Sequence, residues 1–340
     1  MATAPALQDM RYTHVAPPAH LVDLTGRDRD WVLGLFARAE ELRVARRTLK
    51  TPRPLAGRTA ALVFHKPSLR TRVSFTVGMH ELGGDAVDLS AAEVSENGRE
   101  SLKDVAHVLS SMTQLIVIRT FAHGVVLALA EHATVPVINA LTDFSHPCQI
   151  LSDLYTLWRA ERDLDSITVA WVGDGNNVLH SWLQAATIFG FDLNVAVPDG
   201  FEPDGGLFLE AERRSRGSIR RFREPREAVH AADVVYTDTW VSMGQEKDAA
   251  WRTASFAGYQ VNAGLLGLAR PDAVFMHCLP AHRGEEVTDE VIDGPHSIVV
   301  EQAENRLHLQ KALMLELVRA NEAARADAGQ PKRGGGPAAQ

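Results

Sequence analysis

The sequence predicts an α/β protein of two domains, each built on a mostly parallel sheet flanked by helices. Short β-branched runs alternate with amphipathic helical patterns along most of the chain. The length of 340 residues and the apolar content of 45% suffice for two hydrophobic cores. Charged residues of both signs make up 23%, with a net charge of -8, which excludes a disordered polyelectrolyte and argues against nucleic acid or an anionic membrane as a partner.

Cysteine usage and the amino terminus bear on location. The two cysteines, Cys148 and Cys278, cannot form a disulfide framework, and free thiols suit a reducing compartment. We expect neither a secretory signal nor a transit peptide, because residues 1–20 contain no apolar segment and only one arginine. No run approaches the roughly 18 apolar residues of a membrane helix. The chain is therefore expected to be cytoplasmic.

The elements follow each other in two series. Residues 1–18, rich in Ala and Pro, are expected to be disordered, and a stripe from Trp31 to Leu42 predicts a core-packing helix. The strands of the first domain, residues 19–150, are expected at 59–64, 115–118 and 135–138. The second domain, residues 151–300, should contain strands at 168–172, 193–197, 234–236 and 274–276, with the boundary in the helix after Gln149. A final helix is expected at 301–320, followed by a disordered tail at 321–340 that contains Gly-Gly-Gly-Pro.

An anion site is indicated where the first strand turns into a helix. The segment from Phe64 to Arg72 places Ser68, Arg70 and Thr71 at a helix start, with backbone N–H groups, hydroxyls and guanidinium groups at one point. A helix N-terminus favours a phosphate, and an arginine fork can bind two of its oxygens. A capped helix with a surface arginine would explain Ser68 but not the complete Ser-x-Arg-Thr-Arg pattern.

This pattern resembles the carbamoyl-phosphate loop of the aspartate/ornithine carbamoyltransferase family. The match extends to His146-Pro147-Cys148-Gln149 and to Arg119 at the end of a strand, and it covers about residues 20–320. The resemblance implies a carbamoyl-phosphate-binding first domain, a second domain that binds the acceptor, and a last helix that packs on the first domain. It implies that carbamoyl phosphate is bound by Ser68, Leu69, Arg70, Thr71, Arg119, His146, Gln149, Cys278, Leu279 and Arg306.

The chemistry of carbamoyl transfer fits these residue types. The donor has a phosphate to be bound and a carbonyl oxygen that becomes negative as an amine attacks, so donors must converge on both. By resemblance, Arg119, His146 and Cys278 are catalytic, the first two with Thr71 as an oxyanion site. At Leu69, where the family more often has Thr, a backbone N–H suffices.

The second half resembles the ornithine enzymes of the family. Their acceptor signature, Asp-x-x-x-Ser-Met-Gly, begins at Asp238 and includes Ser242 and Met243, and Gly-Asp-x-x-Asn-Asn resembles the segment ending at Asn177. Ornithine carries an α-ammonium, which Asp238 would pair with, and an α-carboxylate, which Asn177 and the Ser242-Met243 turn would bind. By resemblance, Cys278 lies beside the attacking Nδ and helps it, with Asp238, to lose a proton.

Two motifs of the second half could also be interpreted as a metal site and a dinucleotide site. The spacing of His277, Cys278 and His282 does not make a convincing zinc set, so no metal is expected. The glycine-rich turn after residue 172 has Val178 where a dinucleotide fingerprint needs its third glycine, so no cofactor is expected. The seven arginines between residues 213 and 226 alternate with glutamates and are interpreted as a solvated face.

The resemblance therefore predicts transfer of the carbamoyl group of carbamoyl phosphate to the side-chain amine of L-ornithine, giving L-citrulline and phosphate in arginine metabolism. Two alternatives are a carbamoyltransferase for an N-acylated ornithine and a catalytically silent binding homologue. A homotrimer is expected from the family; higher assembly, and a role in arginine synthesis or breakdown, stay open. The loop at Val94–Ser101 lacks the usual cross-subunit glutamine, so the residue among 93–99 that replaces it is also open.

Overall fold

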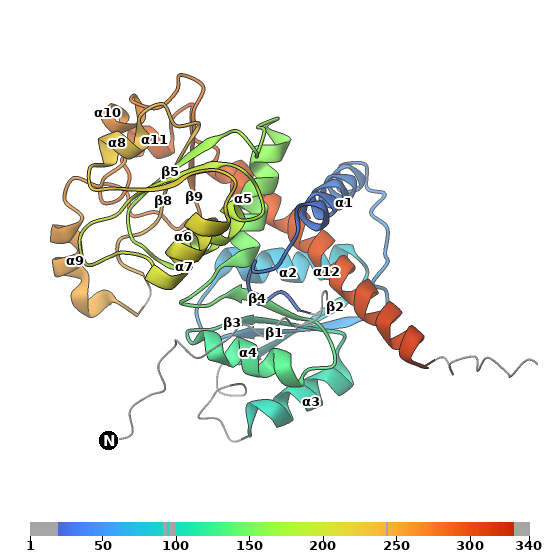
Figure 1. Ribbon diagram of the computed structural model, residues 1–340. Helices are drawn as coiled ribbons and strands as arrows, with labels where there is room; N and C mark the ends of the chain where they lie inside the picture. Colours follow the sequence, from blue (N-terminus) through green and yellow to red (C-terminus); the bar gives the residue numbers. More distant parts are fainter. Residues whose placement is uncertain (1–19, 91–93, 95–99, 243, 330–340) are drawn as a thin grey trace, which may run out of the picture.

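The computed structural model describes residues 20–90, 94, 100–242 and 244–329. Residues 1–18, for which disorder is expected, lie outside these ranges. So do almost all of the 93–99 loop and Met243. Within the described ranges the chain forms two sheets of parallel strands, and helices cover both faces of each sheet (Figure 1). This confirms the expected fold class. No helix in the described ranges is long and apolar enough to cross a membrane.

The first sheet has four parallel strands in the order β2-β1-β3-β4. Helices α1, α2 and the carboxyl-terminal α12 lie on one side of this sheet, and α3 and α4 lie on the other (Figure 1). The strands are β1 (Thr59–Phe64), β2 (Asp85–Ser90), β3 (Leu115–Arg119) and β4 (Val137–Leu141). The helices are α1 (Arg29–Arg47), α2 (Leu69–Glu81), α3 (Leu102–Met112) and α4 (His123–His132).

Side-chain alternation along β1 explains the two layers. Leu62 and Phe64 face the core formed with α1, α2 and α12, whereas Ala61 and Val63 face the core formed with α3 and α4. A strand buried on both faces must be apolar wherever it is buried, and β1 is apolar from Ala60 to Phe64. Its near-continuous apolar run therefore predicts it with its observed bounds.

The second sheet has five parallel strands in the order β7-β6-β5-β8-β9. Its inner strands are apolar on both faces like β1, with Trp171 of β5 packing toward α6 and Val172 toward the α8 side. The strands are β5 (Thr168–Val172), β6 (Asp192–Ala196), β7 (Ile219–Phe222), β8 (Val234–Thr237) and β9 (Val274–His277). The helices are α6 (Asn177–Ala186), α7 (Gly205–Arg214), α8 (Pro225–Val229), α9 (Ala249–Ser255), α10 (Ala263–Leu266) and α11 (Asp289–Ile292), with a short 3-10 turn η2 (Glu246–Asp248).

Two helices connect the halves. Helix α5 (Pro147–Arg159) contacts α6 as well as β4, and α12 (Val299–Gly329) packs against α1, α2 and α5. The carboxyl-terminal helix thus returns to the first domain, as expected. It is longer than the expected 301–320, however, so residues 321–329 are helical rather than part of a disordered tail. The segment after Arg319 is rich in Ala, Glu and Arg, which favour helix, and meets no glycine or proline before Gly329.

Two strands have no counterpart in the predicted set. Both β2 and β7 are edge strands whose side chains are largely exposed, so neither has the apolar run that marks a buried strand. In β7 only Ile219 is buried, while Arg220 and Arg221 face solvent. All seven arginines of the 213–226 cluster are exposed, which agrees with a solvated face. The strands β4 and β6 are displaced by one to three residues from their expected positions.

Candidate active site

The candidate site residues follow the carboxyl ends of strands in both sheets. Arg119 ends β3 and His146 lies just after β4, while Asp238 follows β8 and Cys278 follows β9. In parallel α/β sheets ligands bind outside the carboxyl ends of the strands, because the connecting loops there converge. The arrangement therefore directs side chains from both domains to one region.

The expected phosphate loop forms the start of α2. The Ser68 hydroxyl caps the helix by accepting the backbone N–H of Thr71 at 3.3 Å. The side chain of Leu69 is 74% exposed, so this residue can contribute through its backbone N–H in the first helical turn. Arg70 is half-buried and close enough to Cys278 and Asp238 to be influenced by their charges.

Arg306 of α12 reaches this loop from the far end of the chain. Its Nη2 donates to the hydroxyl of the buried Thr71 at 2.8 Å, across 235 positions of sequence. Its Nε is buried without a hydrogen-bond partner among the described residues. The structure therefore brings Arg306 and Thr71 together, as the resemblance implies.

Three arginines concentrate positive charge at the end of β3. The pKa of Arg119 is lowered to about 10, first by burial, then by the charge of Arg306, with Arg70 acting in the same direction. The Nε of Arg119 is also buried without a partner in the described part of the chain. Cations held this close repel each other unless an anion lies between them, so the cluster favours a ligand with more than one negative charge.

His146 is a buried neutral imidazole beside these cations. Burial, followed by the charges of Arg306 and Arg119, holds its pKa well below the ordinary value. Its backbone N–H donates to the hydroxyl of Ser181 on α6 at 2.9 Å, which fixes the start of α5 against the second domain. Its Nδ1 has no partner within the described ranges, so the ring is available to a ligand. A neutral histidine beside arginines can donate to a developing oxyanion.

Asp238 is held by three donors of the second domain. Its Oδ2 accepts Asn176 Nδ2 at 2.7 Å, and its Oδ1 accepts the N–H of Thr239 at 2.8 Å and the Cys278 thiol at 3.0 Å. Asn176 meanwhile caps α6 with its own side-chain oxygen. Sequence reasoning missed Asn176, although it stands next to Asn177 in a motif that was singled out; its two roles depend on the fold.

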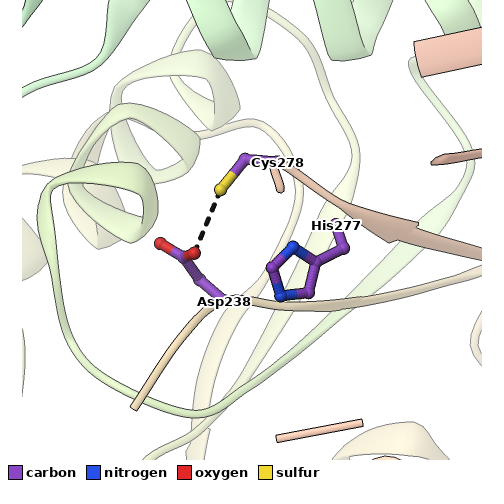
Figure 2. A group of neighbouring side chains, drawn as sticks. All are labelled: Asp238, His277 and Cys278. Atoms are coloured by element: carbon purple, nitrogen blue, oxygen red, sulfur yellow. Dashed lines mark hydrogen bonds between the residues drawn. The ribbon is translucent and has the colours of Figure 1, made fainter. Parts of the chain in front are cut away.

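The Cys278 thiol and the Asp238 carboxylate form a close pair. Figure 2 shows the sulfur directed at the carboxylate, with the ring of His277 to one side. Burial, followed by the negative charge of Asp238, raises the pKa of Cys278 well above the ordinary value. The sulfur is therefore a protonated hydrogen-bond donor at neutral pH rather than a thiolate.

A metal at this point would have to compete with existing hydrogen bonds. Potential ligand atoms of Asp238, His277 and Cys278 lie within 4.8 Å of one another. However, the Nδ1 of His277 accepts the N–H of Leu279 at 2.8 Å, and its Nε2 lies 3.2 Å from the buried carboxylate of Glu286. Both nitrogens are occupied, and Cys278 is protonated, so this donor set fits structure better than metal binding.

The remaining acceptor residues are less closely grouped. Asn177 donates to the carbonyl of Thr142 in the first domain at 2.6 Å. The backbone N–H of Ser242 donates to Gln245 at 3.1 Å, and among the described residues no hydrogen bond joins Ser242 to Asp238 or Asn177. Gly244 has a positive φ of 97°, which favours glycine, and a side chain there would contact Phe121 of the first domain.

Gln149 lies in the first turn of α5 and is 1% exposed. Its amide nitrogen donates to Asp153 at 2.8 Å, and its Oε1 is buried without a partner in the part of the chain described. Asp153 is absent from the set predicted by sequence, because an aspartate inside a helical pattern gives no signal of burial.

Known proteins share both the sequence and the fold. The model of the "Aspartate/ornithine carbamoyltransferase, carbamoyl-P binding domain" matches residues 19–159, and the "Asp/Orn binding domain" model matches residues 165–317. The "Ornithine carbamoyltransferase" of Mesorhizobium japonicum is 54% identical over 77% of this chain and 86% of its own. That of Chlorobaculum tepidum is 47% identical over 86% and 88%. The ornithine carbamoyltransferase structure from Pyrococcus furiosus has a TM-score of 0.84 at 47% identity, covering 87% of this chain and 95% of that one.

Proposed function

The chain belongs to the aspartate/ornithine carbamoyltransferase family, and on that premise we propose that it transfers the carbamoyl group of carbamoyl phosphate to the side-chain amine of L-ornithine, releasing L-citrulline and phosphate. The observation that carries the proposal is the meeting of Arg306, Thr71 and Arg119 at one end of the site with Asp238 and Cys278 at the other. Curated relatives that carry the name ornithine carbamoyltransferase support the choice of acceptor.

The cationic end suits the donor. Ser68, Leu69, Arg70 and Thr71 offer the helix N-terminus and a guanidinium fork to the phosphate, and Arg306 adds a second. Arg119 and neutral His146 polarise the carbonyl oxygen, which becomes negative as the amine attacks. In this assignment Gln149 and Leu279 complete the donor pocket.

The acidic end suits the acceptor. Asp238 pairs with the α-ammonium of ornithine, and Asn177, Ser242 and Met243 bind the carboxylate end. The neutral Nδ attacks the carbonyl carbon, the new C–N bond forms, and the C–O bond to phosphate breaks. Because an alkyl ammonium titrates near pH ~10.4, Nδ must first lose a proton, and in this proposal, by resemblance to the family, Cys278 and Asp238 assist that loss. The leaving phosphate accepts the proton released from nitrogen after attack.

The acceptor assignment is tested with ornithine and N-acetylornithine side by side, with carbamoyl phosphate saturating. Ornithine can pair its charged α-ammonium with Asp238, whereas an acylated α-amine carries no charge and forms no such pair. Citrulline should therefore form readily, and acetylcitrulline at a rate at least about tenfold lower per unit acceptor. Preference for the acylated substrate would instead indicate the acylornithine branch. A failure to release phosphate with either acceptor would indicate a silent homologue.

Three finer assignments are part of the same proposal. The chain acts in arginine metabolism and as a homotrimer, as the resemblance implies, and in the cytoplasm, which its free cysteines favour. Sedimentation of the purified protein tests the trimer. A monomer at working concentration would contradict it.

A further inference from the structure

Asp153 is fully buried on α5, and the mechanism above does not use it. Its Oδ1 accepts hydrogen bonds from Gln149 Nε2 at 2.8 Å and from Gln302 Nε2 at 2.9 Å, and its Oδ2 accepts the hydroxyl of Tyr236 at 2.8 Å. Gln149 lies four residues before Asp153, so the two share one face of the helix. The four side chains come from α5, β8 and α12, where the two domains meet.

The direction of these hydrogen bonds is determined from one end of the network. A side-chain amide has an accepting oxygen and a donating nitrogen of similar shape, so its orientation follows from its partners. The backbone N–H of His277 can only donate, and Gln302 Oε1 accepts it at 3.0 Å. Gln302 must therefore present its nitrogen to Asp153.

The same logic carries over to Gln149. Burial raises the pKa of Asp153 to about 7, and above that pH both carboxylate oxygens can only accept, so Gln149 bonds to Oδ1 only through Nε2. The Oε1 of Gln149 is then directed elsewhere, buried and without a partner in the described chain. A buried acceptor left unpaired is destabilising unless a ligand supplies the missing donor.

The unpaired atoms at this end of the site match a carbamoyl group. Arg119 and Arg306 each have a buried Nε without a partner among the described residues, and Gln149, with its unpaired acceptor oxygen, stands three residues after His146, whose pKa the charges of both arginines lower. A carbamoyl group has a carbonyl, which needs donors, and an NH₂, which needs an acceptor. An acyl phosphate of the same shape has a methyl group in that place and offers no N–H.

We propose that Asp153 is a positioning residue, which holds the amide of Gln149 with its oxygen toward the donor and so makes the site select a carbamoyl NH₂ over an acyl methyl. This inference rests on the proposed function, because it takes carbamoyl phosphate as the donor. Asp153 itself touches no substrate and acts through Gln149.

The test compares two stable donor analogues by calorimetry without ornithine. Phosphonoacetamide and acetonylphosphonate share a phosphonate and a carbonyl, and they differ only in NH₂ against CH₃. The wild type should bind the amide about 5- to 150-fold more tightly, the range expected for one buried polar group left unpaired. In Asp153→Ala the shared acceptor is removed, so nothing holds the Gln149 amide in one orientation, and the ratio should fall to within about threefold of unity. Asp153→Asn should keep the ratio, because Gln302 still needs an acceptor where Oδ1 lies, and the asparagine oxygen placed there continues to accept from Gln149.

Two further variants separate positioning from a merely structural role. Tyr236→Phe is the matched control, because it removes the bond to the other carboxylate oxygen and the 3.1 Å bond that the hydroxyl accepts from Gln302 Nε2, while both bonds to Oδ1 remain; it should lower stability and keep the analogue ratio. In Gln149→Ala the ratio should already be lost, and adding Asp153→Ala should change it no further. A structural role would weaken both analogues equally in every background.

A wild-type ratio near one would overturn the inference without any variant, and so would a ratio retained in Asp153→Ala. If neither analogue bound the wild type, the proposed function itself would fail. Selective binding that is insensitive to Asp153 would leave the proposed function in place and remove only the positioning role.

Discussion

Replacing Asp238 by asparagine is expected to impair the use of ornithine while leaving the binding of carbamoyl phosphate intact. The carboxylate accepts donors from Asn176, Thr239 and Cys278. An asparagine has one accepting oxygen, so its nitrogen must face a donor on one side. Asn176 cannot turn to accommodate it, because its own oxygen caps α6.

The two substrates should respond with opposite signs. Leaving the α-ammonium of ornithine without its counter-ion typically costs about 2–5 kcal/mol, which is roughly thirty- to several thousand-fold in kcat/KM for ornithine. The negative charge of Asp238 acts on Arg70 and Arg119, as the upward influence on the pKa of both shows. Its removal leaves these cations to the phosphate alone, so donor affinity should stay equal or increase.

The assay is a pair of titrations on Asp238→Asn: donor affinity by calorimetry without ornithine, and initial rate against ornithine with donor saturating. Asp233→Asn is the matched control, because Asp233 precedes β8 whereas Asp238 follows it, and its carboxylate accepts the N–H of Thr168 at 2.8 Å. The control should lose some stability and keep its kinetics. Unchanged ornithine kinetics in Asp238→Asn, or donor binding weakened as much as ornithine use, would refute the acceptor assignment.

Three further results are expected. Arg70→Lys keeps the charge but loses the planar fork, so the dissociation constant of carbamoyl phosphate should rise at least about tenfold by calorimetry; near-normal affinity would exclude the phosphate loop. Cys278 should react with iodoacetamide at pH 8 more than about tenfold more slowly than an ordinary thiol of pKa ~8.5, because its raised pKa keeps it protonated; rapid alkylation would contradict this. Burial lowers the pKa of His20 to about 4, so the unfolded chain binds its proton more readily, and stability should fall between about pH 6.5 and 4 by up to about 3 kcal/mol. Chemical denaturation of the wild type and of His20→Gln across this pH range measures the effect. An equal dependence of the unfolding free energy on pH in the two proteins would refute it.

The strands show what local sequence determines and where it fails. Both β1 and β5 have the bounds that the sequence predicts, because each continues after its first threonine as an unbroken apolar run that is buried on both faces of the sheet. The edge strands β2 and β7 escape prediction, because their exposed side chains are not constrained to be apolar. Helix α12 extends beyond the end that the sequence predicts, because its last turns are helical without an apolar stripe.

The candidate site also has features that local sequence indicates and features that only the tertiary structure shows. The motifs around Ser68, His146 and Asp238 carry the resemblance to the carbamoyltransferases, because each consists of a few consecutive positions that can be read from the sequence. The metal interpretation of His277 could be weighed from spacing, but its two hydrogen bonds, to Leu279 and Glu286, are visible only in three dimensions.

By itself the sequence determined the two-domain α/β fold, the family and most candidate ligands, since these depend on periodicity and on short motifs. Only the tertiary structure shows that Arg306 donates a hydrogen bond to Thr71, 235 positions away, and that the Cys278 thiol donates one to Asp238. It alone revealed the orientation of the Gln149 amide, which depends on a chain of donors and acceptors running through α12 and α5. A hydrogen bond has a direction and a length of about 3 Å, and neither can be inferred from residue types until the path of the chain brings the partners together.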